Sequence, residues 1–203
     1  MLVYMVRHGE TYNNASAVFP LDDTELNENG LEQARETGKY LEQLYFDAVY
    51  SSPVLRVKQT LENMGIDRYI TDNRLRDIGT GKLTGMKITE IESKDPAWYS
   101  TFQDGVENRY GVEKFSDLKK RVKEFIGSIS GNGFKKVLIA THLEPIRGMY
   151  SLSTGVEGLP LTSLEISNCS ISIFSVEGFD IELKGFNWLP LNNYPDRKNK
   201  SFN

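Results

Sequence analysis

The sequence predicts an α/β protein, and more specifically a three-layer α/β/α sandwich around a mostly parallel sheet. Two short runs, 2–6 and 137–140, are wholly apolar, as is typical of strands buried on both faces of a parallel sheet. These runs alternate along the chain with longer segments whose apolar residues recur at helical spacing. The 203 residues, 39% of them hydrophobic and 26% charged, suit a single domain over 1–203 with a sizeable core.

The first strand is expected over residues 2–6 and is followed by Gly9, which permits a tight turn. Residues 24–30 have the composition of a helix start. Apolar residues recur at helical spacing from Leu31 to Leu44, so a helix is expected there.

A second strand is expected over residues 47–50 and a short third strand over 69–71. Between them, Ser51-Ser52-Pro53 is interpreted as an N-cap with proline in the first turn. The helix that it opens is expected to run to about Met64.

Residues 73–111 differ from the rest of the chain, since they combine many charges with glycines at 79, 81, 85, 105 and 111. We expect loops and short helices that form a lid-like excursion from the sheet. Three aromatic residues in this segment, Trp98, Tyr99 and Phe102, are expected to pack in a core rather than to form a platform for a substrate.

The last third of the chain returns to strands and helices. An amphipathic helix over 113–129 is expected to end at Gly131-Asn132-Gly133, before the strand at 137–140 and a helix over 145–152. The alternating segment 170–176 predicts a strand with one wet face, paired as a hairpin with 181–186 across Glu177-Gly178. The polar tail over 192–203 is expected to fray.

Composition excludes several classes of protein. The net charge is −4 and the sequence pI is near 5.4, so neither nucleic acid nor an anionic membrane is expected as a partner. No apolar stretch approaches the ~20 residues that span a bilayer, and the N-terminal run lacks a cleavage-site pattern. The single cysteine, Cys169, cannot form an intrachain disulfide, and no Cys/His cluster has zinc spacing. We therefore expect a cytoplasmic protein without a metal or cofactor.

Both histidines of the chain follow a buried strand. His8 lies in Arg7-His8-Gly9, and His142 lies five residues before Arg147. Ligands of α/β sheets bind beyond the carboxyl ends of the strands, so the fold is expected to bring the two histidines to one edge. Histidine is the side chain most easily set as nucleophile, acid or base near neutral pH, and arginine matches phosphate oxygens. The pattern therefore predicts an anion site, most simply for phosphate.

At these positions the chain resembles the histidine phosphatase superfamily, which includes the cofactor-dependent phosphoglycerate mutases. The segment Val6-Arg7-His8-Gly9-Glu10-Thr11 matches the family's defining motif at the end of the first strand. The similarity covers residues 1–176 and implies a phosphoglycerate mutase-like fold. Further family elements follow in order: Asn14, the segment 51–60 with Arg56, the loop 75–78 with Asp77, Gly111 to Glu113 followed by Arg121, the segment 141–147 with His142, and the last core strand at 168–170.

The resemblance implies a role for each of these residues. His8 would be the nucleophile that attacks phosphorus, its other ring nitrogen held by the carbonyl of Gly9. Protonated His142 would stabilise charge on the phosphoryl oxygens. Asp77 would protonate the leaving alkoxide and then accept a proton from water. The phosphate would be bound by the guanidinium groups of Arg7 and Arg56, by Asn14 and Thr11, and by backbone N–H groups near Leu143.

Two residues depart from the family pattern. Most members have glutamate where this chain has Asp77, and aspartate is one methylene shorter and intrinsically more acidic. Glu10 and Glu144 therefore stay open as alternative proton donors. The usual glycine after the second histidine is Leu143 here, followed by Glu144. Its backbone N–H can still bind phosphate, while the added bulk and negative charge are expected to narrow the choice of substrate.

These observations predict a metal-independent phosphatase that hydrolyses a small phosphorylated metabolite through a phosphohistidine at His8. The alternatives are a cofactor-dependent phosphoglycerate mutase and, from another class, a non-catalytic phosphate-binding regulatory module. The segment 86–110 disfavours the mutase, because it has few cations to bind a second anionic group: Lys87, Lys94 and Arg109 against Glu90, Glu92, Asp95, Asp104 and Glu107. A monomer and a homodimer both stay open.

Overall fold

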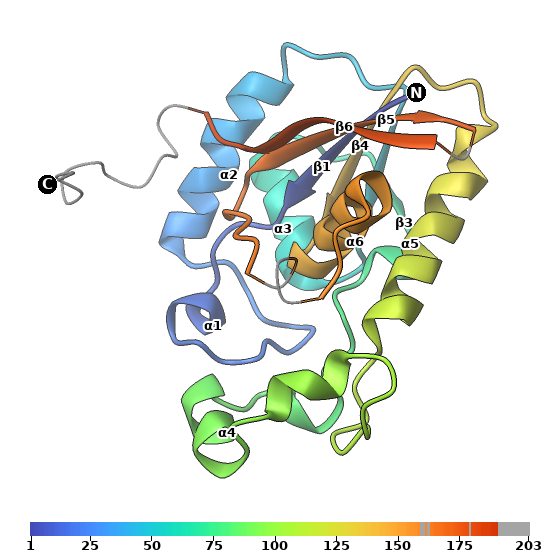
Figure 1. The fold of residues 1–203 in the computed structure, drawn as a ribbon. Helices are drawn as coiled ribbons and strands as arrows, with labels where there is room; N and C mark the ends of the chain where they lie inside the picture. The colour runs from blue at the N-terminus through green and yellow to red at the C-terminus, as the bar shows by residue number, and fades with distance from the viewer. Residues whose placement is uncertain (159–160, 162, 179, 191–203) are drawn as a thin grey trace, which may run out of the picture.

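The fold is that of a mixed sheet covered by helices on both faces (Figure 1). The computed structural model describes residues 1–158, 161, 163–178 and 180–190. The polar segment 192–203, for which fraying was predicted, lies outside the described residues.

The sheet has six strands in the order β3-β2-β4-β1-β5-β6. The first four of this order are parallel to one another, and β5 and β6 add an antiparallel edge. The predicted mostly parallel α/β sheet and the predicted hairpin are both confirmed. The strands are β1 (Leu2–Arg7), β2 (Ala48–Ser51), β3 (Ile70–Thr71), β4 (Lys136–Thr141), β5 (Ile171–Glu177) and β6 (Asp180–Trp188).

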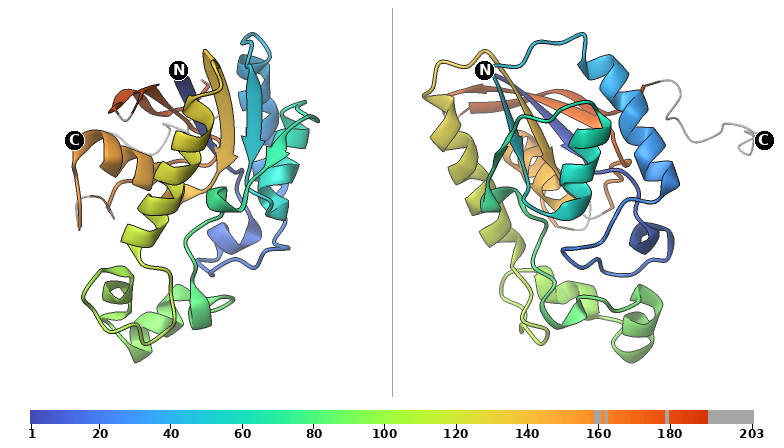
Figure 2. Two further views of the ribbon diagram at one scale, coloured as in Figure 1. Left: turned by 90° about the vertical axis from the view of Figure 1, so that its right-hand side faces the viewer. Right: turned by 180° about the vertical axis from the view of Figure 1, so that it is seen from behind.

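Two helix pairs complete the three layers, as both views of Figure 2 show. Helices α2 (Glu28–Leu41) and α3 (Leu55–Asn63) cover one face of the sheet. Helices α5 (Phe115–Ser130) and α6 (Leu143–Thr154) cover the other face. Each pair seals its own apolar cluster against β1 and β4, so these central strands are buried on both faces.

The excursion consists of short elements joined by loops, beyond the carboxyl end of β1 in Figure 1. Its elements are η1 (Asn73–Leu75), η2 (Gly81–Leu83), α4 (Ile88–Lys94) and η3 (Trp98–Phe102). The last three of these elements enclose a separate apolar cluster that contains buried Trp98 and Phe102, so the predicted packing role of these two aromatics is confirmed.

The expected N-cap at Ser51-Ser52-Pro53 is wrong. Ser51 ends β2, and α3 begins at Leu55 with Val54 as its N-cap residue, which makes no side-chain capping bond. Ser52 is fully buried, and its hydroxyl contacts the ring of His142 instead. Tertiary contact thus decides the role of a serine whose local sequence suggested capping.

The expected wet face of β5 is also wrong. Ile171 and Ile173 contact the cluster beneath α2 and α3, whereas Phe174 and Val176 belong to the cluster beneath α5 and α6. The apolar pattern changes phase between Ile173 and Phe174, so both faces of the strand are covered. Ser172 shares the second face and is fully buried.

Two helices begin at other residues than expected. Helix α5 begins at Phe115, because the backbone of Glu113 is bonded to Gly79. Helix α6 begins at Leu143, so that Pro145 lies inside its first turn, where a missing N–H costs no intrahelical bond. His142 thereby becomes the N-cap residue of α6.

Near the N-terminus, α1 (Tyr12–Ala15) is a single turn that follows the His8 loop. This loop lies close to the start of α2, since a Cβ added to Gly9 would be 2.5 Å from the carbonyl oxygen of Gly30. A Cβ added to Gly30 would in turn be 2.1 Å from the carbonyl oxygen of Glu10. The two glycines therefore allow the loop after β1 to pack directly on a helix backbone.

Candidate active site

His8 has a defined tautomer in this structure. Its Nδ1 is 2.8 Å from the carbonyl oxygen of Gly9, and a carbonyl only accepts, so Nδ1 carries the proton. Its Nε2 accepts a hydrogen bond from Nε of Arg56 at 3.3 Å. The nitrogen with a free electron pair therefore faces Arg56, as a nucleophile directed toward a bound anion would.

Hydrogen bonds also fix the backbone around His8. The N–H of Gly9 donates to the hydroxyl of Thr60 at 3.0 Å. The amide of Asn168 donates to the carbonyl oxygen of His8 at 2.9 Å. The ring is thus held by contacts from α3 and from the segment before β5.

Arg56 links the two histidines. Besides its contact with His8, its Nη2 donates to Nδ1 of His142 at 3.2 Å, and its Nη1 donates to the carbonyl of Leu21 at 3.0 Å. The nearest carboxylate oxygen in an ion pair with Arg56 is Oδ2 of Asp77 at 3.9 Å. Arg56 is 3% exposed, so its positive charge is buried with Asp77 as a counter-ion at the long distance of 3.9 Å.

His142 lies behind Arg56 and is fully buried. Because its Nδ1 accepts from Arg56, its Nε2 carries the proton and donates to the hydroxyl of Ser52 at 2.9 Å. The ring centres of His8 and His142 are 5.2 Å apart, so the fold brings both strand-end histidines together as predicted.

Burial and the arginines favour the neutral form of both histidines. Burial first, and then Arg56 and Arg7, hold the pKa of His8 well below 6.5. Burial and Arg56 lower the pKa of His142 in the same way. The first result agrees with the predicted nucleophile. The lowered pKa of His142 and its hydrogen bond from Arg56 favour a neutral imidazole, not the protonated His142 that the family resemblance implied.

Arg7 supplies the second guanidinium of the site and is half-buried. Its Nη1 donates to the carbonyl of Ile166, while its Nε is buried without a hydrogen-bond partner within the described part of the chain. Burial lowers the pKa of both Arg7 and Arg56, and Asp77 partly offsets this effect. Two desolvated positive groups with an unused donor make a site that an oxyanion would stabilise.

Asn14 and Thr11 form a capping box around α1. The hydroxyl and the N–H of Thr11 both donate to Oδ1 of Asn14, and the N–H of Asn14 donates back to the Thr11 hydroxyl. Asn14 lines the main cavity, whereas Thr11 is fully buried and does not. Thr11 thus orients Asn14, with the amide oxygen occupied and the NH₂ group left as the donor.

Asp77 approaches the same centre from the excursion. Its Oδ2 lies 3.9 Å from Nη2 of Arg56 and 3.9 Å from Nδ1 of His142. Its Oδ1 accepts from the N–H of Ile78 at 3.0 Å. With 29% of its side chain exposed, Asp77 is open to a ligand and to water.

The two alternative proton donors differ in position. Glu144 lines the main cavity and accepts from Nη1 of Arg147 at 2.7 Å. Burial raises the pKa of Glu144 despite this partner. Glu10 accepts from the amide of Asn27 at 2.7 Å and is not among the residues that line the cavity.

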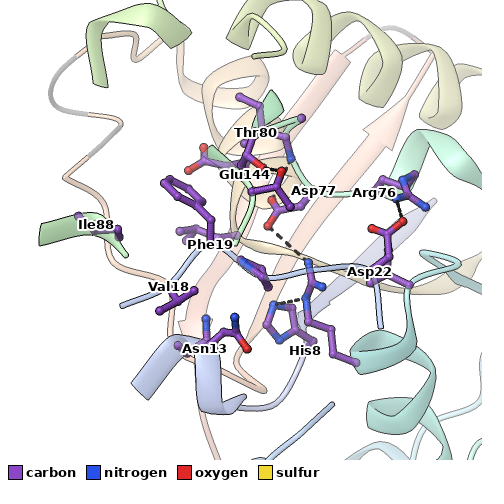
Figure 3. A pocket seen from close by; sticks show the side chains of 18 of the residues that line it. His8, Asn13, Val18, Phe19, Asp22, Arg76, Asp77, Thr80, Ile88 and Glu144 are labelled. Atoms are coloured by element: carbon purple, nitrogen blue, oxygen red, sulfur yellow. Dashed lines mark hydrogen bonds and ion pairs between the residues drawn. The ribbon is translucent and has the colours of Figure 1, made fainter. Parts of the chain in front are cut away.

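These groups surround a cavity of about 540 Å³ (Figure 3). His8 and Asp77 point into it from different elements, and Phe19 and Ile88 line its other side. Leu143 also lines it, at the first residue of α6, where helix N–H groups lack intrahelical partners. Of the predicted site residues, Arg7, His8, Asn14, Arg56, Asp77 and Leu143 line the cavity, while Thr11 and His142 support it from behind.

Comparison with known proteins decides the family. The family model of the histidine phosphatase superfamily, branch 1, matches residues 3–189. The chain belongs to the histidine phosphatase superfamily.

Similar proteins of this superfamily include both mutases and phosphatases. The 2,3-bisphosphoglycerate-dependent phosphoglycerate mutase of Thermoplasma acidophilum is 31% identical over 87% of this chain and 88% of its own. Phosphoserine phosphatase 1 of Hydrogenobacter thermophilus is 28% identical over 85% of each chain. The solved structure of Bacillus stearothermophilus YhfR matches with a TM-score of 0.80 at 28% identity, over 92% of this chain and 96% of its own.

The structure of this histidine phosphatase superfamily member also contains site residues that sequence reasoning missed. Ser52 was interpreted as a cap, yet it is the hydrogen-bond partner of His142. Arg121 and Glu113 were noted only as part of a family-like helix start, yet they hold the loop that contains Asp77. Their charge was visible in the sequence, but nothing local indicated which backbone they bind.

Proposed function

We propose that this protein is a metal-independent phosphatase that hydrolyses a small phosphomonoester through a phosphohistidine at His8. The observation that supports it most is the unprotonated Nε2 of His8 in a cavity with two arginines, buried Arg56 and half-buried Arg7. A phosphate dianion would stabilise these guanidinium groups and meet a nucleophile at the same place.

In the first step, the phosphate oxygens take over the donors that Arg56 now directs at the histidines. Nε2 of His8 forms a bond to phosphorus as the bond from phosphorus to the alcohol oxygen breaks. The alcohol leaves with a proton from Asp77. The carbonyl of Gly9 keeps the Nδ1 proton in place and stabilises the positive charge that develops on the ring.

In the second step, water replaces the alcohol. Asp77, now a carboxylate, takes a proton from the water as its oxygen attacks phosphorus and the P–N bond breaks. Inorganic phosphate leaves and His8 returns to its neutral tautomer. His142 contributes a hydrogen bond or, where the nearby dianion raises its pKa enough for it to take up a proton from water, a positive charge.

Asp77 is the proposed proton donor because its carboxylate is adjacent to both Arg56 and His142. Glu144 is the second candidate, since burial raises its pKa toward the range useful for an acid, although Arg147 occupies one of its oxygens. Glu10 is bound to Asn27 outside the cavity lining, which gives it no path to the alcohol oxygen.

Hydrolysis is preferred to mutase activity because a mutase must bind a second anionic group firmly. Among the described residues that line the cavity, the cations are Arg7, Arg56 and Arg76. The first two face the proposed phosphate, and Arg76 is paired with Asp22. The mutase stays the alternative, because several of the similar proteins bear that name.

The test is phosphate release combined with trapping of the phosphoenzyme. We expect release of phosphate from p-nitrophenyl phosphate and an acid-labile phosphoryl group on His8 after rapid quenching. Absence of release between pH 5 and 8, with phosphate still bound, would support the binding module instead. Turnover of 3-phosphoglycerate only with added 2,3-bisphosphoglycerate would establish the mutase.

The same proposal includes the domain organisation of the protein and its location in the cell. A single domain with a lid-like excursion is supported by the family match over residues 3–189. A cytoplasmic location is supported by the single, buried thiol of Cys169. No helix in the described part of the chain is long and apolar enough to cross a membrane. Whether two copies form a homodimer is a question for sedimentation measurements.

A further inference from the structure

A second cavity adjoins the active site. Its volume is about 270 Å³, near the lower end of the range for ligand pockets. Three residues, Phe19, Ile78 and Glu144, line both cavities, and Figure 3 shows Phe19 and Glu144 in the wall of the main one. The two cavities are therefore neighbours, and a molecule whose phosphate is bound at His8 would reach the second cavity past these shared residues.

Aromatic rings dominate the lining of this second cavity. Tyr99 and Phe102 of η3 are 5.6 Å apart at their ring centres, and Phe19 and Phe115 complete the set. Burial raises the pKa of Tyr99 to about 12, so its phenol stays neutral at physiological pH. Flat apolar walls of this kind favour an aromatic occupant, because rings pack face to edge or in offset stacks.

The charges around the second cavity disfavour an anionic occupant. Its described lining contains three carboxylates, Asp104, Glu144 and Glu157, and no lysine, arginine or histidine. The cations that pair with two of them, Arg147 with Glu144 and Lys119 with Glu157, are not among the lining residues. A carboxylate placed here would lose its water without gaining a positive partner.

We propose that the alcohol part of the substrate is an aromatic group without negative charge that occupies this second cavity. The inference rests on the proposed phosphatase function and narrows its substrate to one chemical class. Hydrolysis breaks the P–O bond at His8, the alcohol oxygen takes the proton of the catalytic carboxyl, and the free aromatic alcohol departs. The carboxylate of Glu144 then separates the phosphate from the aromatic group.

The first test compares three aryl phosphate esters that differ in length or in charge. Phenyl phosphate is short, 4-biphenylyl phosphate is long and neutral, and 4′-carboxy-4-biphenylyl phosphate is long and anionic. We expect kcat/KM for the neutral biphenyl ester to exceed that for the carboxy ester by about tenfold or more. Equal kcat/KM values for these two esters would overturn the charge requirement.

The second test locates the aromatic group. Gln103 lines the second cavity, Thr84 lines the main cavity, and both are exposed. Gln103→Trp should lower the ratio of kcat/KM for biphenylyl over phenyl phosphate by about fivefold or more, by narrowing the second cavity. If Thr84→Trp lowers this ratio and Gln103→Trp does not, the alcohol takes the other route and the inference is wrong.

A charge reversal completes the set. Asp104→Lys places a cation at the second cavity and should raise the relative kcat/KM for the carboxy ester about fivefold. Asp67→Lys makes the same change at an exposed site outside both cavities and serves as the matched control. If no ester releases phosphate, the proposed function fails. If all three are cleaved through His8 without discrimination, the function stands and only this inference fails.

Discussion

At the scale of single residues, the reactivity of this site depends on which nitrogen of His8 holds a proton. The carbonyl of Gly9 assigns the proton to Nδ1, and the donor of Arg56 keeps Nε2 unprotonated. Both effects come from groups fixed by the fold, and burial reinforces them by lowering the pKa of His8. The proposed nucleophile therefore has its Nε2 unprotonated in the folded protein.

Replacement of this nucleophile should separate chemistry from binding. His8→Asn removes the attacking nitrogen but leaves Arg7 and Arg56 in place, so we expect turnover to fall by about a thousandfold or more. Phosphate affinity, measured by isothermal titration calorimetry, should change much less. Substantial residual turnover in His8→Asn would assign the nucleophile to another residue.

The proton donor can be identified from its dependence on the leaving group. Asp77→Asn should slow the hydrolysis of an alkyl phosphate by about a hundredfold, because an alkoxide needs a proton to leave. p-Nitrophenyl phosphate should be affected far less, since its phenolate is a good leaving group. Glu144→Gln is the matched comparison, and a larger alkyl-specific loss in that variant would transfer the role to Glu144.

At the scale of elements, two charged residues hold the loop that contains Asp77. Arg121 lies in α5, and Glu113 lies just before that helix. Arg121 of α5 donates to the carbonyl oxygens of Arg74, Arg76 and Asp77 at 2.6 to 2.9 Å. The same guanidinium binds Glu113 through Nε and Nη2, and Glu113 accepts the N–H of Gly79 at 2.9 Å. One side chain thus fixes several peptide groups of a loop that lacks regular structure of its own.

Arg121→Lys should therefore impair the proton transfer proposed for Asp77. Lysine keeps the charge but lacks the planar set of donors, so the loop gains freedom and Asp77 loses its position. We expect kcat for an alkyl phosphate to fall about tenfold, with KM little changed and p-nitrophenyl phosphate less affected. Arg74→Lys, a similar change at a partly exposed arginine, is the control. Equal losses for both substrates would indicate general destabilisation of the fold.

The helices and strands also show which features of the fold could be predicted from the sequence. Buried strands and amphipathic helices were predictable because their burial pattern is local, and the strand-end rule brought His8 and His142 to one edge. Three features could not be predicted, because each depends on what packs against it. They are the role of Ser52, the start of α6 and the second buried face of β5. The sequence displays Arg121 as one charge among many, and only the fold shows which carbonyls it binds.

At the scale of the whole molecule, the buried histidines link the site to the stability of the fold. His8 and His142 are buried, and their pKa values lie well below 6.5 in the folded state. The unfolded chain binds protons at these groups near pH 6.5, whereas the folded protein does not until the pH is much lower. Stability falls with decreasing pH wherever the unfolded state binds more protons.

Acidification from pH 7 to 5 should therefore lower the free energy of unfolding, by up to about 1.4 kcal/mol per pH unit for each histidine below its unfolded pKa. Glu144 opposes this trend, because burial raises its pKa and the folded state then binds a proton that the unfolded state lacks. Between pH 7 and 5 the destabilising effect of two histidines exceeds the stabilising effect of one carboxyl group. The other acidic groups do not contribute, because their ordinary pKa values lie below this range. Urea midpoints at pH 7, 6 and 5 measure the effect, and a His8→Asn, His142→Asn double variant should flatten it. A wild-type urea midpoint that stays constant from pH 7 to 5 would show that the folded protein also takes up these protons. The pKa values of the two histidines in the folded protein would then lie close to 6.5, contrary to the prediction.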